Sequence, residues 1–328
     1  MTISFKVPEF QHIVDARARI AGQAHLTPLL SSAYLDELVG GRVLLKAENL
    51  QRTGSFKFRG AFNRLSMIPD EARSAGVVAC SSGNHAQGVA EAARILGMPA
   101  VIVMPEDAPT AKIARTKRSG AEVVTYKRET EDREAIAEAI AAERGATMVH
   151  PYNDPGVIAG QGTLAAEMVE QAEAMGLAPE AMLVCTGGGG MSGGVALALE
   201  RLAPECAFVP VEPEDFDDYG RSLQAGKRVG NARSGGSVCD ALLTPMPGEL
   251  GFEIVRRRAT SGLKVSDEEA LRAVAFAFRE LKLVVEPGGA VCLAAVLSGK
   301  LPVKGRTIAL TLSGGNLDPE MLERALAL

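Results

Sequence analysis

One lysine of this chain stands where an amine could do covalent chemistry. Lys57 lies between Phe56 and Phe58 in ENLQRTGSFKFRGAFNRL, directly after a Thr-Gly-Ser turn. An amine in apolar surroundings has a lowered pKa, so it can act as a nucleophile towards a carbonyl group or as a base. A lysine at this position could equally open an amphipathic helix with its ammonium in water. The other motifs must decide between these two interpretations.

A glycine run offers a second chemical feature. CTGGGGMSGG, residues 185–194, follows an apolar segment and precedes a helical pattern. The glycines at 187–190 leave backbone N–H groups unobstructed, and the helix start adds the positive end of its dipole. These features favour a phosphate site over a merely structural loop. The run is not G-x-G-x-x-G and lacks the G-K-[ST] of a P-loop, so a nucleotide is not the first choice.

Two further polar loops also follow β-rich runs. They are SSGNHAQG at 81–88 and LSGGN at 312–316. Each could simply be a turn with a helix cap, because Ser and Asn commonly serve that purpose. A lysine between aromatics, a phosphate loop and two polar strand ends together indicate a site instead.

The elements that must position these loops are parallel βα units. Apolar β-rich runs alternate with helical patterns: GVVACSS leads into NHAQGVAEAARILG, PAVIVMP into APTAKIARTKRSG, and AMLVCTGGGG into MSGGVALALERL. The loops that follow such strands meet at the carboxyl edge of the sheet, where open α/β sheets bind ligands. Ser266 and Glu269 also predict a capping box at the start of a later helix.

Length and composition predict a two-domain globular protein. The chain has 328 residues, of which 47% are hydrophobic and 23% charged. We expect a small domain at 75–150 inserted into a large one formed by 1–69 and 151–328. The Pro- and Gly-containing stretch at 150–157 is the predicted linker.

Charge and cysteine usage exclude several classes. The net charge of −5 comes from 40 acidic and 35 basic residues with no basic block, so we expect no nucleic-acid partner. No run approaches the roughly 20 apolar residues of a membrane span, and the start lacks a basic segment before an apolar one; we expect a cytoplasmic protein without membrane contact. The histidines lack metal-ligand spacing, and we expect free, buried thiols for the five cysteines: Cys80, Cys185, Cys206, Cys239 and Cys292.

The motifs, in their order and spacing, resemble one enzyme family over nearly the whole chain. TGSFKFRGA, SSGNHAQG, HPYNDPGVIAGQGT, CTGGGGMSGG, VEPEDFDD, EPGGA and LSGGN are similar to those of the pyridoxal-phosphate (PLP)-dependent serine/threonine dehydratase and serine racemase family. That family has the tryptophan synthase β fold, fold type II. The resemblance implies an α/β protein with two domains, each an open, mostly parallel sheet flanked by helices.

The resemblance also implies roles for the candidate residues. Lys57 would hold PLP as a Schiff base and, once displaced, take the α-proton of the substrate. The ring hydroxyl and ring nitrogen of PLP would face Asn84 and Ser313, with the remaining cofactor contacts from Phe56, Gly187, Gly188, Gly189, Gly190 and Met191. The substrate carboxylate would lie on the loop Ser81, Ser82, Gly83, Asn84 and His85. In a racemase, Ser82 would exchange a proton on the face opposite Lys57.

Several functions remain open at this point. The first choice is a dehydratase, an ammonia-lyase that removes water from L-threonine, L-serine or a similar β-hydroxy amino acid to give a 2-oxo acid and ammonia. A serine at the ring nitrogen does not hold it protonated as a carboxylate would, which favours elimination over transamination. Alternatives are a serine racemase, a bifunctional enzyme, a β-replacement enzyme such as cysteine synthase, and a non-enzymatic phosphate or nucleotide sensor.

The resemblance implies two further features. VEPEDFDD matches a divalent-cation site with Glu212, the carbonyl of Phe216 and Asp218 as ligands, an oxygen set that suits Mg²⁺, Ca²⁺ or Mn²⁺. Without the resemblance this segment would be an acidic surface turn. Relatives are commonly dimers, so we expect a homodimer. Tyr152 stands near the substrate position and could alter which side chain fits.

Overall fold

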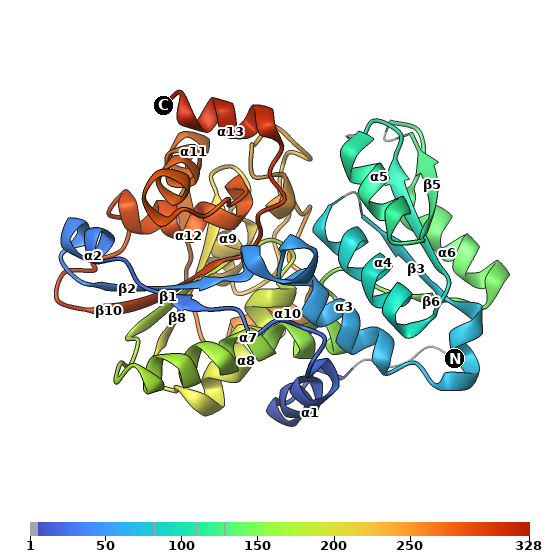
Figure 1. Ribbon diagram of the computed structural model, residues 1–328, viewed down its shortest axis with the longest axis horizontal. Helices are drawn as coiled ribbons and strands as arrows, with labels where there is room; N and C mark the ends of the chain where they lie inside the picture. The colour runs from blue at the N-terminus through green and yellow to red at the C-terminus, as the bar shows by residue number, and fades with distance from the viewer. Residues whose placement is uncertain (1–5, 82, 109, 128) are drawn as a thin grey trace.

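Two separate sheets organise the molecule. The computed structural model describes residues 6–81, 83–108, 110–127 and 129–328. A six-stranded sheet lies on the left in Figure 1 and a four-stranded sheet on the right. The larger sheet has the order β1-β2-β10-β7-β8-β9. Of its described strands, only β1 is antiparallel to its neighbour. Its strands are β1 (Leu29–Leu30), β2 (Arg42–Ala47), β7 (Ala181–Cys185), β8 (Ala207–Pro213), β9 (Leu263–Val265) and β10 (Thr307–Leu312).

The four-stranded sheet is parallel throughout. Its order is β5-β4-β3-β6. Along β3, Val77 and Ala79 join one apolar cluster while Val78 and Cys80 join another, as the alternation of side chains along a strand requires. Both faces are therefore buried. The strands are β3 (Val77–Cys80), β4 (Ala100–Pro105), β5 (Glu122–Tyr126) and β6 (Thr147–Met148).

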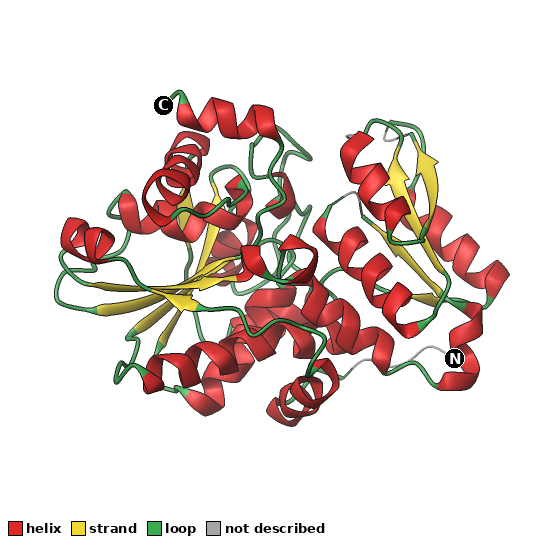
Figure 2. Cartoon of the chain, viewed as in Figure 1, coloured by secondary structure: helices red, strands yellow, loops and turns green. Residues whose placement is uncertain are grey.

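Helices cover both faces of both sheets, as Figure 2 shows by colour. In Figure 1, α7 and α8 lie below the larger sheet and α11 and α12 above it, whereas α4 and α6 flank the smaller sheet. The helices are α1 (Phe10–Ile20), α2 (Ala33–Val39), α3 (Lys57–Ser66), α4 (Asn84–Leu96), α5 (Thr110–Arg118), α6 (Arg133–Arg144), α7 (Pro155–Ala174), α8 (Gly190–Leu202), α9 (Asp218–Ala225), α10 (Glu249–Val255), α11 (Asp267–Phe276), α12 (Pro287–Leu297) and α13 (Pro319–Leu326). This arrangement confirms the predicted fold class.

Glycines bring the backbones of α3, α7 and α8 into contact. A Cβ atom on Gly160 would lie 2.7 Å from the carbonyl oxygen of Arg59, and one on Gly162 would lie 2.8 Å from that of Gly194. Both distances are shorter than real Cβ contacts, so only glycine permits these approaches. The helix that begins at Lys57 and the helix that follows the glycine run are thus both held against α7.

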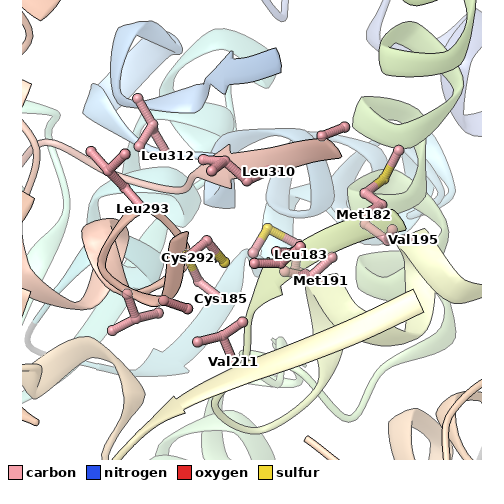
Figure 3. Close-up of a cluster of buried hydrophobic side chains, with 14 of the residues drawn as sticks. Met182, Leu183, Cys185, Met191, Val195, Val211, Cys292, Leu293, Leu310 and Leu312 are labelled. Atoms are coloured by element: carbon pink, nitrogen blue, oxygen red, sulfur yellow. Dashed lines mark hydrogen bonds between the residues drawn. The ribbon is translucent and has the colours of Figure 1, made fainter. Parts of the chain in front are cut away.

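An apolar core fills the space between the larger sheet and its helices. Figure 3 shows part of it, where side chains of β7, β10, α8 and α12 meet. Leu183 and Leu310 are fully buried, and Cys185 and Cys292 lie side by side among the apolar residues. All five cysteines are free and buried, as expected.

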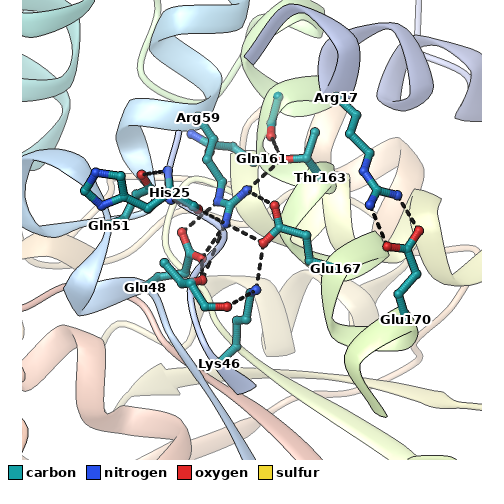
Figure 4. A network of polar contacts seen from close by, with 12 residues as sticks. Arg17, His25, Lys46, Glu48, Gln51, Arg59, Gln161, Thr163, Glu167 and Glu170 are labelled. Atoms are coloured by element: carbon teal, nitrogen blue, oxygen red, sulfur yellow. Dashed lines mark hydrogen bonds and ion pairs between the residues drawn. The ribbon is translucent and has the colours of Figure 1, made fainter. Parts of the chain in front are cut away.

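A buried network of charges ties α3 to its neighbours (Figure 4). Arg59 donates two hydrogen bonds of 2.8 Å to Glu48 and two of 2.7 Å to Glu167. Lys46 donates to Glu167 at 2.7 Å and to the carbonyl of Thr27 at 2.8 Å. Two cations thus face two carboxylates. Because each group is paired and hydrogen-bonded, the network avoids the large cost of an isolated buried charge.

Of two predictions made from short sequence segments, one is confirmed and the other is wrong in part. Ser266 and Glu269 form the predicted capping box at the start of α11. The predicted linker at 150–157 is wrong at its end: Pro155 opens α7, because proline fits the first helical turn and Asp154 caps the helix by accepting from the N–H of Val157. None of the helices in the described ranges has the length and apolar character to cross a membrane.

Candidate active site

The carboxyl edges of the two sheets face a common cavity of about 200 Å³. Loops that are far apart in the sequence contribute to its wall, because each follows a parallel strand or opens a helix. The cavity brings together most of the predicted site residues. Those that line it are Phe56, Lys57, Ser81, Gly83, Asn84, His85, Gly187, Gly188, Gly189, Gly190, Met191 and Ser313.

Lys57 is the first residue of α3 and points into this cavity. Its Nζ donates a 2.9 Å hydrogen bond to the carbonyl oxygen of Pro151 and lies 5.2 Å from the centre of the Phe56 ring. Burial lowers the pKa of the Lys57 amine to about 8, although the carboxylate of Glu286 opposes this change. The side chain is only half-buried by area, but the amine itself lies inside the cavity. A lysine with this pKa can supply a neutral amine near physiological pH.

The glycine run forms a cradle at the start of α8. Gly189 caps the helix with φ of +94°, a conformation that favours glycine. A Cβ on Gly189 would collide with the hydroxyl of Tyr219, and one on Gly188 with the ring of Tyr152. The loop therefore excludes side chains, and the first N–H groups of α8 lack partners within the helix. An anion can occupy such a site.

Asn84 is held in one orientation by two neighbours. Its Oδ1 accepts a 2.7 Å hydrogen bond from Nδ2 of Asn316, and its own Nδ2 donates to Glu286 at 2.6 Å. Asn316 also donates to the carbonyl of Thr53 at 2.8 Å, which fixes its amide as the donor. The second hydrogen on Nδ2 of Asn84 stays available for a ligand, because an amide nitrogen carries two.

The polar loop before α4 lies at the cavity wall, and Ser82 lies outside the described residues. The backbone N–H of Gly83 donates to Oγ of Ser81 at 3.2 Å. Nε2 of His85 lies 3.0 Å from the carbonyl oxygen of Val149, so this nitrogen carries the hydrogen. Burial, followed by the charge of Lys57, lowers the pKa of His85 to about 3. His85 is therefore neutral, so its ring brings no positive charge to the loop, and an anion there would be attracted by backbone N–H groups and the start of α4.

Ser313 directly follows β10 and is joined to the lysine loop. Its carbonyl oxygen accepts a 3.1 Å hydrogen bond from the N–H of Phe56, and Ser55 pairs with Gly314 in an isolated bridge. The backbone segments that contain Lys57 and Ser313 are therefore hydrogen-bonded to each other beside the cavity.

Two of the predicted cation ligands, Glu212 in β8 and Asp218 at the start of α9, are both buried away from the cavity. Glu212 is fully buried, and its two oxygens accept 2.8 Å hydrogen bonds from the N–H groups of Tyr219 and Gly220. Asp218 is also fully buried; its Oδ1 accepts from Asn231 at 2.7 Å, and its Oδ2 has no partner among the described residues. Burial raises the pKa of Asp218 to about 7, and burial together with the charge of Asp218 raises that of Glu212.

Some polar residues of the cavity were not predicted, among them Arg133, Glu286 and Asn316. Glu286 and Asn316 belong to motifs that the resemblance includes, EPGGA and LSGGN, but nothing local showed that they would meet Asn84. Arg133 opens α6 of the smaller sheet, and no sequence feature distinguished it from other helix arginines.

Comparison with known proteins identifies the family. A family model described as "Pyridoxal-phosphate dependent enzyme" matches residues 20–314. The chain is 45% identical to an L-threo-3-hydroxyaspartate ammonia-lyase of a Pseudomonas species, with 96% of this chain and 97% of the relative covered. It is 40% identical to a serine racemase of Schizosaccharomyces pombe, with 98% of each covered. The solved structure of a threonine deaminase from T.th. superimposes with a TM-score of 0.89 at 46% identity, covering 95% of this chain and 99% of that one.

The chain therefore belongs to the family of PLP-dependent fold type II enzymes that includes threonine and hydroxyaspartate ammonia-lyases and serine racemases. This confirms the predicted family and the predicted class, a PLP-dependent ammonia-lyase acting on an amino acid. The cavity fits the cofactor: it presents a reactive amine, an anion cradle in which a Cβ would collide, and polar groups between them.

Proposed function

We propose that this enzyme eliminates water from a β-hydroxy amino acid that carries a second carboxylate, with 3-hydroxyaspartate as its preferred substrate. The proposal of an elimination activity rests on the position of Lys57. Its amine shares one cavity with the anion cradle and with the polar loop before α4. The substrate choice rests on Arg133 and on the similarity to the Pseudomonas enzyme. The products are a 2-oxo acid and ammonia.

The residues of the cavity have different roles in the proposed reaction. Gly187–Gly190 would bind the cofactor phosphate, Asn84 would donate to the ring hydroxyl, and Ser313 would face the ring nitrogen. When bound, PLP supplies an electron sink for the α-carbon of the substrate. Lys57 Nζ takes the α-proton, for which its lowered pKa is suited. Phe56 and Tyr152 add aromatic surface to the cavity wall.

Arg133 is placed to bind the second carboxylate. It lines the cavity at the start of α6, and its guanidinium is only loosely paired, lying 4.0 Å from Glu134. Ser81, Gly83, Asn84 and His85 line the same cavity and would bind the α-carboxylate. A guanidinium can bind a carboxylate through two parallel hydrogen bonds, which gives both affinity and orientation. Threonine, whose side chain ends in a methyl group, gains nothing from this contact.

We expect Arg133→Met to reduce kcat/KM for 3-hydroxyaspartate by about 10- to 100-fold, the loss of a charge-assisted hydrogen bond of roughly 1.5–3 kcal/mol. The value for threonine should change little. The matched control is Arg144→Met at the far end of α6, where the arginine pairs with Glu122 on the surface. Steady-state kinetics with both substrates check this. An equal loss for threonine would contradict the assignment of Arg133 to the second carboxylate.

Racemisation is the second candidate function, because the chain is 40% identical to a serine racemase. Ser82, which lies outside the described residues, would serve as the base on the face opposite Lys57. We expect Ser82→Ala to abolish any racemisation of L-serine while elimination persists at a reduced rate. Chiral separation of serine, run beside 2-oxo acid formation, measures both. Racemisation that survives in the variant would exclude Ser82 as the second base.

A divalent cation at Glu212, the carbonyl of Phe216 and Asp218 is also proposed. The support is the unpartnered Oδ2 of Asp218, together with the charge of Asp218 that raises the pKa of the buried Glu212. A hard cation with oxygen ligands would relieve the repulsion between these two carboxylates.

Removing the cation should lower the melting temperature of the enzyme, since a ligand that binds only the folded state stabilises it. We expect a chelator to lower the melting temperature of wild type and to leave Asp218→Asn unaffected. Glu214→Gln, a change in the same segment at an exposed residue, is the control and should respond as wild type does. Thermal unfolding with and without chelator decides the question, and identical curves for wild type would exclude the site.

We further propose that the two sheets are the cores of two domains and that the chain forms a homodimer. The exposed apolar side chains of Tyr34, Leu38 and Phe278 support the second proposal. Sedimentation analysis measures the mass of the protein in solution, and the mass of a monomer would contradict the proposed homodimer.

A further inference from the structure

Two buried thiols face each other directly behind the cofactor cavity. The Sγ atoms of Cys185 and Cys292 lie 3.5 Å apart (Figure 3). Cys185 is the last residue of β7, and Cys292 lies in the middle of α12. A disulfide has an S–S distance of about 2.05 Å, so the two sulfurs must approach each other by roughly 1.5 Å for the bond to form.

The surroundings activate one of the two thiols. Sγ of Cys185 accepts a hydrogen bond from the hydroxyl of Thr311 at 3.5 Å, and as a thiol it donates to the carbonyl oxygen of Gly289 at 3.5 Å. Burial raises the pKa of Cys185, but contacts with Cys292, Thr311 and Ser313 outweigh it and lower this pKa to about 7. Burial, followed by the contact with Cys185, raises the pKa of Cys292. The thiolate is the nucleophilic form.

The two thiols differ in access. Cys185 is buried, with 3% of its surface exposed, but lines the cavity together with Ser313, whereas Cys292 is 0% exposed and does not line it. A small molecule in the open cavity can therefore reach Cys185 first, with Cys292 behind it. The cofactor ring, bound against Ser313, would cover Cys185.

We propose that Cys185 and Cys292 form an oxidisable dithiol, which a hydroperoxide converts to a disulfide when the cavity is open, and that the disulfide opposes cofactor binding. This inference rests on the proposed cofactor site. Cys185 is separated only by Thr186 from the glycine cradle, so pulling its side chain towards α12 displaces the loop that binds the phosphate.

The chemistry is a two-step oxidation with hydrogen peroxide as the oxidant. The thiolate of Cys185 attacks one peroxide oxygen, the O–O bond breaks, and a sulfenic acid forms as hydroxide leaves and takes up the proton that the thiol released. The sulfur of Cys292 then attacks the sulfenic sulfur. An S–S bond forms, and the hydroxyl leaves with the proton of Cys292 as a second water. Two thiols and one peroxide give one disulfide and two waters.

The test compares apoprotein and holoenzyme of the full chain. Both are exposed to hydrogen peroxide, the remaining free thiols are alkylated under denaturing conditions, and the peptides are mapped by mass spectrometry. We expect the apoprotein to yield a peptide pair joined through Cys185 and Cys292, with a mass loss of two hydrogens. PLP should suppress this product in proportion to site occupancy. The oxidised apoprotein should regain less PLP absorbance than the reduced one, and a dithiol reductant should restore it.

Variants separate the dithiol from general oxidation. Cys292→Ser should stop the oxidation of Cys185 at the sulfenic acid, which a dimedone probe traps. Cys80→Ser is the matched control, because Cys80 lines the same cavity but donates to the carbonyl of Arg133 at 2.9 Å, and burial raises its pKa to about 12. This variant should form the disulfide as wild type does. The peptide map of the wild-type protein tests the disulfide even if a variant fails to fold.

Three results would overturn the proposal: a disulfide from Cys185 to Cys239, equal oxidation with and without PLP, or full rebinding of PLP by the oxidised apoprotein. Failure of the proposed function is distinguishable, because a protein that binds no PLP would still give a readable thiol map.

Discussion

Lys57→Ala loses turnover by a factor on the order of 10⁴ or more, and the purified variant lacks the visible absorption of covalently held PLP. General base catalysis alone contributes about 10²–10⁴-fold, and the same amine also forms the covalent link to the cofactor. Lys46, the lysine nearest to Lys57 in the sequence, is fully buried and donates to Glu167, Gln171 and a backbone carbonyl. It is therefore not free to replace Lys57.

Two measurements check the assignment of Lys57. Absorbance spectra and activity are compared among wild type, Lys57→Ala and Lys57→Arg; the arginine variant keeps the positive charge but cannot form the link, so it should fail equally. Borohydride reduction of the wild-type holoenzyme followed by peptide mapping should place the cofactor on Lys57. A label on Lys46 or on any other lysine would show that the site is misassigned.

Breaking the buried charge network should have the largest effect on stability. Arg59→Met leaves Glu48 and Glu167 facing each other with only Lys46 to compensate them. Removing one partner from a buried ionic network typically costs about 3–5 kcal/mol of unfolding free energy, because uncompensated charge stays buried. Denaturant unfolding measures this loss.

The control for Arg59 is an exposed ion pair to the same helix, α7 (Figure 4). Arg17 of α1 pairs with Glu170 at the surface, where both side chains are about half-exposed. Arg17→Met should cost less than about 1 kcal/mol, as exposed pairs do. Adding Glu48→Gln to Arg59→Met should recover part of the loss, because the two sites are coupled. Equal losses for the two arginine variants would contradict the account.

The effect of Arg59 also depends on pH. Burial raises the pKa of Glu48, but Arg59 and then Lys46 outweigh it, so the pKa in the folded protein lies below the ordinary value. The stabilisation is therefore fully present above the ordinary carboxylate pKa and is lost as the pH falls through the lowered one. The difference between wild type and Arg59→Met should narrow in acid.

The sequence was sufficient for features that are local. The glycine cradle, the loop before α4 and the capping box at Ser266 each arise from a few consecutive residues whose backbone geometry follows from their types. The alternation of β-rich and helical runs likewise predicted parallel sheets, since such runs report which faces are buried.

Contacts across the fold could not be predicted in this way. Asn84 and Asn316 are 232 residues apart, and the thiols of Cys185 and Cys292 are 107 apart. Whether such pairs meet depends on strand order and helix packing, which no short pattern reports. The antiparallel β1 and the two-residue β6 also escaped prediction, because such short segments carry too little periodicity.

The glycine contacts along α7 have a consequence for how substrate preference can change. They join the helix of Lys57 and the helix of the phosphate cradle into one block, while the loop before α4 and Arg133 belong to the smaller sheet. Most of the proposed cofactor contacts, including Lys57 and the glycine cradle, therefore belong to one block, whereas Arg133 and Asn84 belong to the other. We expect that exchanging the segment from Val77 to Met148 for that of a relative, with Asn84 kept, would transfer a new substrate preference, and that mutations elsewhere in this segment can accumulate during evolution without loss of the cofactor.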